Sequence, residues 1–182
     1  MDVTVRPGPV VDLHPSLLPI AFLLGTWRGE GVGGYEGMDA FRYGQEVVFF
    51  STGRPALSYT SHTWWIGEPR DGRSEGSPLA TETGFWRVQP GEGDGPPTVE
   101  VMLAHPFGIS EIYVGDVVGT RVELRSNVVI RTATARRVDR SQRLYGLVEG
   151  DLAYAIDMAA EGKPLQSHLS ARLQRVSAAD RP

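Results

Sequence analysis

The chain has 182 residues, of which 41% are hydrophobic and 22% are charged, so it has the size of one globular domain with a substantial core. Its formal charge of -4 disfavours nucleic acid as a partner, because a phosphate backbone is recognised by clustered lysine and arginine. The absence of cysteine excludes disulfide scaffolds, thiolate metal sites and cysteine nucleophiles.

The beginning of the chain reads as a tail followed by one helical turn. Residues 1–13 carry charges and prolines without the pattern of a signal peptide, and we expect them to form a flexible tail. The apolar stretch at 17–24 is interrupted by Pro19 and is much shorter than the roughly 20 residues of a membrane-spanning helix. We therefore expect a cytoplasmic protein without membrane contact, in which residues 14–24 form a short helical turn that serves as a plug or lid.

From Gly25 onward, polar and apolar residues alternate with the period of a β-strand. Clusters of glycine, proline and aspartate separate the alternating segments, as turns do. The candidate strands are 26–31, 44–50, 56–65, 79–88, 98–104, 108–114, 121–126, 133–139, 142–148, 151–158 and 165–175. This series, without helical segments between its members, predicts an all-β fold: a closed antiparallel β-barrel of about ten strands over residues 14–176, with a C-terminal tail at 177–182.

The first predicted strand opens with a G-x-W-x-G-x-G run made by Gly25, Trp27, Gly29 and Gly31. Glycines permit strong strand curvature and the close approach of a neighbouring backbone. A tryptophan that points inward can close the end of a barrel when its indole N–H finds an acceptor. We therefore interpret this run as a structural motif.

Several segments recur along the chain in an order that is typical of one known family. They are His14-Pro15, the run from Leu23 to Gly31, Glu82-Thr83-Gly84-Phe85-Trp86-Arg87, Ala104-His105-Pro106-Phe107-Gly108-Ile109-Ser110-Glu111 and Pro164-Leu165-Gln166-Ser167-His168-Leu169. Together they resemble the nitrobindin family over nearly the whole chain, from His14 to Val176. The resemblance implies a calycin-like barrel, similar in shape to fatty-acid-binding proteins, with one haem b per subunit at its mouth. It also implies isomerisation of peroxynitrite to nitrate at ferric haem, and binding of nitric oxide.

His168 matches the axial histidine of that family. It follows residues 162–164 near the start of the last predicted strand, where a side chain can lean over a barrel mouth. A neutral imidazole there can donate a lone pair to iron and leave the opposite face open for a small ligand. The alternative is a surface histidine at a strand end. His105 is the second-choice ligand, although the Pro106 and Gly108 that follow it favour a corner between strands.

Three further expectations concern the surroundings of the haem. Many nitrobindins carry a distal histidine where this chain has Ala80, so the resemblance implies a more apolar distal side. Arg136 aligns with a basic residue that contacts haem in relatives, and its guanidinium is suited to a propionate; the alternative is a solvated charge on a strand. Thr26 and Thr83 are candidates to line the cleft, although threonine is also common in strands for its β-propensity.

A second hypothesis is a carrier that holds a fatty acid or another hydrophobic ligand in the same barrel, without catalysis. Arg87 and Arg125 are then the candidate interior partners of a carboxylate. Each of the adjacent pairs Trp64-Trp65 and Phe85-Trp86 places one ring on either face of its strand. The outward rings leave a homodimer contact, or a pure interaction domain, as open alternatives.

Overall fold

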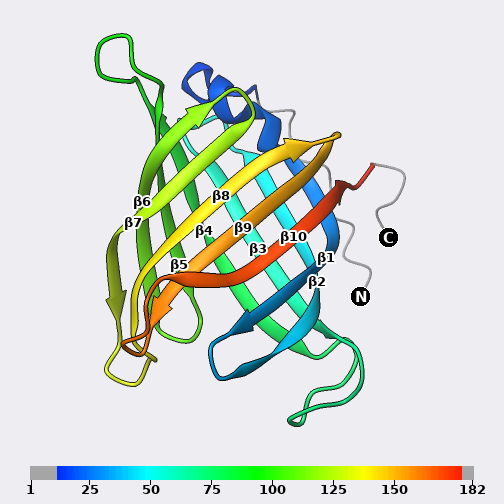
Figure 1. The fold of residues 1–182 in the computed structure, drawn as a ribbon. Helices are drawn as coiled ribbons and strands as arrows, with labels where there is room; N and C mark the ends of the chain where they lie inside the picture. The colour runs from blue at the N-terminus through cyan, green and yellow to red at the C-terminus, as the bar shows by residue number, and fades with distance from the viewer. Residues whose placement is uncertain (1–11, 178–182) are drawn as a thin grey trace, which may run out of the picture.

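Residues 12–177 are described by the computed structural model, so the tails predicted at 1–13 and 177–182 lie almost wholly outside the described residues. Ten antiparallel strands close into a barrel in which neighbours in sequence pair with one another and β1 pairs with β10 (Figure 1). This architecture confirms the predicted fold. The strands are β1 (Gly25–Tyr35), β2 (Met38–Ser51), β3 (Leu57–Ile66), β4 (Pro78–Gln89), β5 (Thr98–His105), β6 (Ile109–Val118), β7 (Arg121–Arg131), β8 (Val138–Val148), β9 (Asp151–Ala160) and β10 (Gln166–Arg175).

One predicted strand, at 133–139, is wrong except for its last two residues, which begin β8. β7 ends at Arg131, β8 begins at Val138, and the residues between them form a largely exposed loop. Residues 133–137 are small or charged, so neither face of a strand at that place would bury apolar surface. The backbone turns instead, and the N–H of Ala135 donates to the carbonyl of Thr132 at 3.2 Å.

β1 and β2 are longer than the sequence pattern indicated. β1 continues to Tyr35 and β2 begins at Met38, so the turn lies at Gly37 (φ +82°) rather than at the Gly33-Gly34 pair. Alternation fails as a signal here, because the extended ends of both strands stand at the rim of the barrel and are only partly buried. These rim residues form part of the cavity described below.

The predicted helical turn is the 3₁₀ helix η1 (Pro15–Leu23), which lies across one end of the barrel (Figure 1). Its Leu17, Ile20 and Leu23 are fully buried in the main apolar core. The indole N–H of Trp27 donates to the carbonyl of Leu23 at 2.8 Å, which is the acceptor that the tryptophan of the G-x-W-x-G-x-G run requires. The helix therefore plugs this end of the barrel. No helix among residues 12–177 is long and apolar enough to cross a membrane.

Gly31, in the same run, is required by a close approach of neighbouring groups. It lies opposite Tyr43 of β2 and Ala171 of β10. A Cβ at Gly31 would collide with the Tyr43 ring and stand 2.6 Å from the carbonyl oxygen of Ser170. The glycine thus lets the Tyr43 ring fold over the β1 backbone.

Candidate functional site

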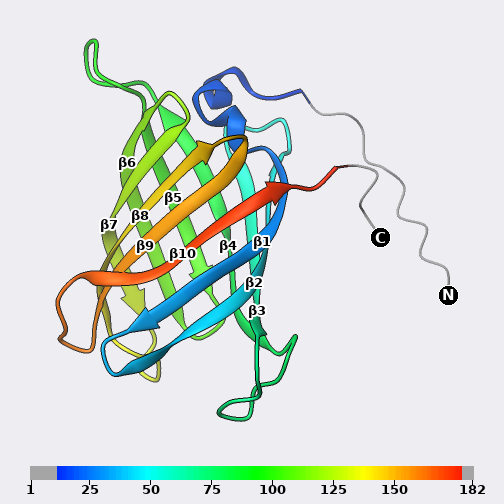
Figure 2. The same ribbon diagram turned by 45° about the vertical axis from the view of Figure 1, so that its right-hand side comes forward.

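A cavity of about 510 Å³ opens at the end of the barrel opposite η1. This volume lies within the range of small-molecule and cofactor sites. Its rim includes the β1–β2 turn and the β3–β4 connection, and that connection projects beyond the barrel in Figures 1 and 2. The deep wall combines aromatic and aliphatic side chains with a few polar ones: Tyr43, Gln45, Val47, Tyr59, Ser61, Glu82, Arg143, Tyr145, Leu152, Tyr154 and Ile156.

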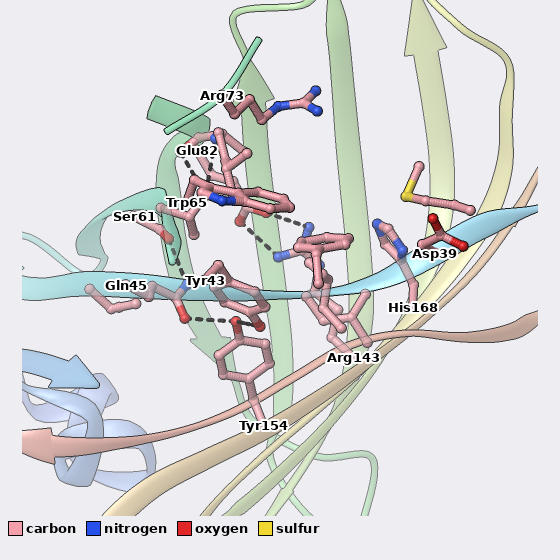
Figure 3. A pocket seen from close by; sticks show the side chains of 18 of the residues that line it. Asp39, Tyr43, Gln45, Ser61, Trp65, Arg73, Glu82, Arg143, Tyr154 and His168 are labelled. Carbon is pink, nitrogen blue, oxygen red and sulfur yellow. Dashed lines mark hydrogen bonds and ion pairs between the residues drawn. The ribbon is translucent and has the colours of Figure 1, made fainter. Parts of the chain in front are cut away.

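His168 lies on the wall of this cavity because of an irregularity in β10. Ser167 pairs with Asp157 and Leu169 pairs with Ile156, the next residue of β9, so His168 is left without a partner on that strand. A bulge of this kind redirects a side chain and is common beside functional sites. Figure 3 shows the imidazole turned toward the cavity. It is half-buried, so the surface-histidine alternative does not describe its surroundings.

Hydrogen bonding fixes the tautomer of this imidazole. Its Nδ1 lies 3.0 Å from the carbonyl oxygen of Gly34, and because a carbonyl only accepts, Nδ1 carries the proton and Nε2 keeps its lone pair. Burial lowers the pKa of His168 below its usual value; the bond to Gly34 opposes that shift and nearby Arg143 adds to it. The ring of Tyr35 packs edge-on at 5.7 Å. A neutral imidazole, anchored through Nδ1 beside a cavity of cofactor size, has the donor arrangement of an axial ligand to haem iron.

His105 does not share this arrangement. It ends β5, and its carbonyl accepts from the N–H of Gly108 at 3.1 Å, which places it at the expected corner between strands. Its Nε2 lies 2.9 Å from a carboxylate oxygen of Glu111. The residue lines a smaller neighbouring cavity of about 130 Å³ rather than the main one. Its outer nitrogen is therefore already engaged by a carboxylate.

A buried ion pair, which sequence reasoning missed, lies in the cavity wall. The side chain of Arg143 is only 4% exposed and donates to both carboxylate oxygens of Glu82, at 2.8 and 3.1 Å. It also lies 3.4 Å from Glu111. Burial by itself would raise the pKa of Glu82, but Arg143 outweighs burial and holds that pKa below its usual value. The pair is thus charged and mutually neutralised.

A chain of uncharged polar groups completes the deep wall. The side-chain amide of Gln45 donates to Ser61 at 2.8 Å and accepts from the hydroxyl of Tyr154 at 2.6 Å. The hydroxyls of Tyr154 and Tyr43 are also 2.6 Å apart. Burial raises the pKa of Tyr43 to about 12, so the phenol stays protonated at neutral pH. These groups satisfy one another, and the wall presents no unpaired charge here.

The predicted haem partners other than His168 lie elsewhere. Arg136 is exposed in the β7–β8 loop, not on a strand, and it lines neither cavity; its contact with a propionate stays a prediction. Thr26 and Thr83 are also absent from both linings, and Thr83 donates to the carbonyl of Tyr59 at 3.3 Å. Ala80, at the expected distal position, does line the main cavity.

The side chains suggested for a fatty-acid carrier point outward. Arg87 pairs with Glu100 and Arg125 pairs with Glu123, and their side chains are 50% and 67% exposed. Neither arginine is therefore an interior partner for a carboxylate.

The aromatic pairs divide between the two faces of the sheet as expected. Trp86 is fully buried while Phe85 is 53% exposed, and Trp65 lines the cavity while its neighbour Trp64 does not.

Two arginines of the β3–β4 connection, Arg70 and Arg73, also line the cavity. The sequence pattern predicts this stretch only as a turn. The two arginines that flank Asp71-Gly72 were the available sign that a hairpin places both side chains on one face.

Comparisons with known proteins agree with this geometry. Residues 16–175 match the sequence model of a family described as "THAP4-like, heme-binding beta-barrel domain". A "Peroxynitrite isomerase" from Frankia casuarinae is 79% identical over 92% of this chain and 89% of its own length. A "Ferric nitrobindin-like protein" from Kineococcus radiotolerans is 49% identical over 91% and 96% of the two chains. Among solved structures, Rv2717c from M. tuberculosis superposes with a TM-score of 0.78 at 39% identity, covering 91% of this chain and all (100%) of that one.

Proposed function

The chain belongs to the family of THAP4-like, heme-binding β-barrel domains, and from this premise we propose that it binds one haem b beside His168 and isomerises peroxynitrite to nitrate there. The names of relatives at 79% and 74% identity, both peroxynitrite isomerases, support the activity. Nitric oxide is a second ligand of the same site in this proposal, because a small neutral diatomic fits an open iron position.

The hydrogen bond between His168 and Gly34 carries the proposal. It holds the proton on Nδ1 and presents the lone pair of Nε2 to the cavity, and burial keeps the ring neutral. Iron ligation needs that tautomer, and a second hydrogen bond on the ligand ring fixes its orientation. The residues present therefore fit a haem.

The remaining lining residues support a bound cofactor without competing for it. When bound, ferric haem supplies a Lewis-acidic iron at which the peroxynitrite anion rearranges to nitrate. Aromatic side chains such as Trp65 and Phe41, stacked 6.1 Å apart, give the cavity apolar surface that excludes water. Arg143 is neutralised by Glu82 and contributes no free charge to the interior. That neutralisation leaves Arg143 without a free charge for the carboxylate of a fatty acid, the ligand of the alternative carrier.

Titration of the purified protein with haemin tests the proposal. We expect a saturable Soret change at one haemin per chain, and a loss of affinity of at least tenfold in His168→Ala, because the iron then lacks its protein ligand. His62→Ala is the matched control, since His62 is exposed on β3. The loaded protein should convert peroxynitrite to nitrate with little nitrite. A Soret band unchanged by His168→Ala, or decay of peroxynitrite no faster than in buffer, contradicts the proposal.

A further inference from the structure

The β3–β4 connection carries a tight hairpin with the sequence Arg70-Asp71-Gly72-Arg73. Its backbone closes through two hydrogen bonds, from Arg70 N–H to the Arg73 carbonyl at 3.0 Å and from Arg73 N–H to the Arg70 carbonyl at 2.9 Å. Asp71 and Gly72 both have positive φ, +52° and +76°, as a type I′ turn requires. Residues paired across such a turn project from the same face. Both arginines accordingly line the cavity.

The two arginines differ in what they contact. The guanidinium of Arg70 lies 5.0 Å from the centre of the Trp65 ring and 3.6 Å from a carboxylate oxygen of Asp39. Arg73 makes no ion pair or side-chain hydrogen bond with any of residues 12–177. Because Glu82 already neutralises Arg143, Arg73 is the arginine of the described cavity lining whose charge has no partner.

Arg73 also stands across the cavity from His168. Arg73 lies on the connection between β3 and β4, which are three and four strands away from β10 in the ring of ten strands. Figure 3 shows Arg73 on the side of the β3–β4 connection and His168 on the other side of the open space. A small ligand in the open space on the far side of the cavity from His168 would therefore lie beside the wall that carries Arg73. Ala80, on that same wall, offers no donor.

We propose that Arg73 binds the anionic ligand on the cavity face opposite His168, and so selects anions such as peroxynitrite over neutral ligands. The inference rests on the proposed function and deepens it by naming a specificity-determining residue. A guanidinium forms strong, charge-assisted hydrogen bonds with small oxyanions, and it stays charged throughout the physiological pH range. Ala80 on β4 has no hydrogen-bond donor in its side chain, and the guanidinium of Arg73 on the hairpin supplies one instead.

Ligand affinities of the haemin-loaded protein test this inference. Azide and fluoride serve as anionic probes and imidazole as the neutral probe, each titrated by its Soret change. We expect Arg73→Ala to weaken azide and fluoride binding about tenfold, and Arg73→Lys to lose less, because a charge-assisted hydrogen bond disappears only in the former. Imidazole affinity should change less than about twofold. The difference in azide and fluoride affinity between the parent and Arg73→Ala should be smaller in 1 M salt, because Arg73 is exposed and its charge is screened.

Arg54→Ala is the matched control, since Arg54 is an exposed arginine on the β2–β3 connection, at the η1 end of the barrel. Unchanged azide affinity in Arg73→Ala overturns the inference while the proposed function stands. Weaker binding of haemin, but not of haemin dimethyl ester, with unchanged azide affinity identifies a propionate contact instead and also overturns it. If the unmodified protein binds no haemin, the proposed function fails and the inference fails with it.

Discussion

The imidazole of His168 donates to the carbonyl of Gly34 at a point where the backbone ladder between their strands has already ended. The last backbone pair of β1 and β10 is Gly33 with Leu169. Beyond that pair the register shifts twice: between β1 and β2 after Gly33, where β2 carries the extra residue, and between β10 and β9, where His168 is the extra residue. The His168 side chain thus bonds to β1 where the backbone ladder stops, and the bulge in β10 turns its ring in that direction.

Stability of the protein without haem should fall as the pH drops below about 6.5, the ordinary pKa of histidine, in part because of His168. Burial lowers its pKa in the folded state, so the unfolded chain binds more protons in this range and protonation favours unfolding. Urea unfolding between pH 7.5 and 5 measures the effect. His168→Gln should show a shallower dependence on pH, while His62→Gln, an exposed control, should keep that of the parent. Identical slopes in all three proteins would contradict this prediction.

Removing the buried guanidinium should destabilise the barrel strongly. Arg143→Met leaves Glu82 and Glu111 buried without their cation, which costs about 3–5 kcal/mol in comparable pairs. Addition of Glu82→Gln to this variant should restore part of the loss, because one uncompensated charge is removed. Chemical unfolding at pH 7 gives the free energies. Arg125→Met, which changes an arginine that is 67% exposed, should stay within about 0.5 kcal/mol of the parent.

Acid should destabilise the protein further through its buried carboxylates. Arg143 holds the pKa of Glu82 below its usual 4.5 despite burial, and His105 and Arg143 do the same for Glu111. The stabilisation is complete above about pH 4.5 and is lost as the pH falls through the lowered pKa of the folded state. Thermal midpoints from pH 6 to pH 3 should therefore fall less steeply in Glu82→Gln than in the parent. Glu123→Gln, at a side chain that is 42% exposed, serves as the control, and equal steepness in Glu82→Gln and the parent would count against the role of the buried pair.

Gly31→Ala should cost about 1–3 kcal/mol, because the new methyl group collides with the Tyr43 ring and cannot be accommodated without moving a strand. Gly146→Ala is a matched glycine in β8, where the nearest atom to a Cβ is the Thr120 carbonyl oxygen at an ordinary 3.5 Å. Its free energy of unfolding should change little or rise. Urea unfolding of both variants gives the two free energies of unfolding. Equal values would show that the close approach of the Tyr43 ring to Gly31 does not require a glycine.

Period-two alternation was sufficient to predict the closed barrel, because the sheet buries one face along most of its strands. Alternation was unreliable where neither face of a segment is well buried. The rim ends of β1 and β2 are only partly buried and were missed, and residues 133–137, predicted as part of a strand, bury neither face and form a loop. Burial, rather than local propensity, decides which of these segments pair.

The site was less accessible to sequence reasoning than the fold. His168 was found through a family pattern, but its bulge and its bond to Gly34, 134 residues away, cannot be recognised from local sequence. Arg143 and Glu82 are 61 residues apart, and an arginine at an inward strand position gives no sign of its partner. Arg73 was visible only as one side of a turn, because the direction of a hairpin relative to a cavity is a property of the assembled barrel.

The plug formed by η1 has a consequence for exchange between the cavity and solvent. The end of the barrel beneath it is filled by fully buried side chains, among them Leu17, Ile20 and Trp27, so exchange with solvent runs through the opposite rim. A cofactor held at that rim would therefore also control the exchange of small molecules with the deep part of the cavity, because the other end of the barrel is closed.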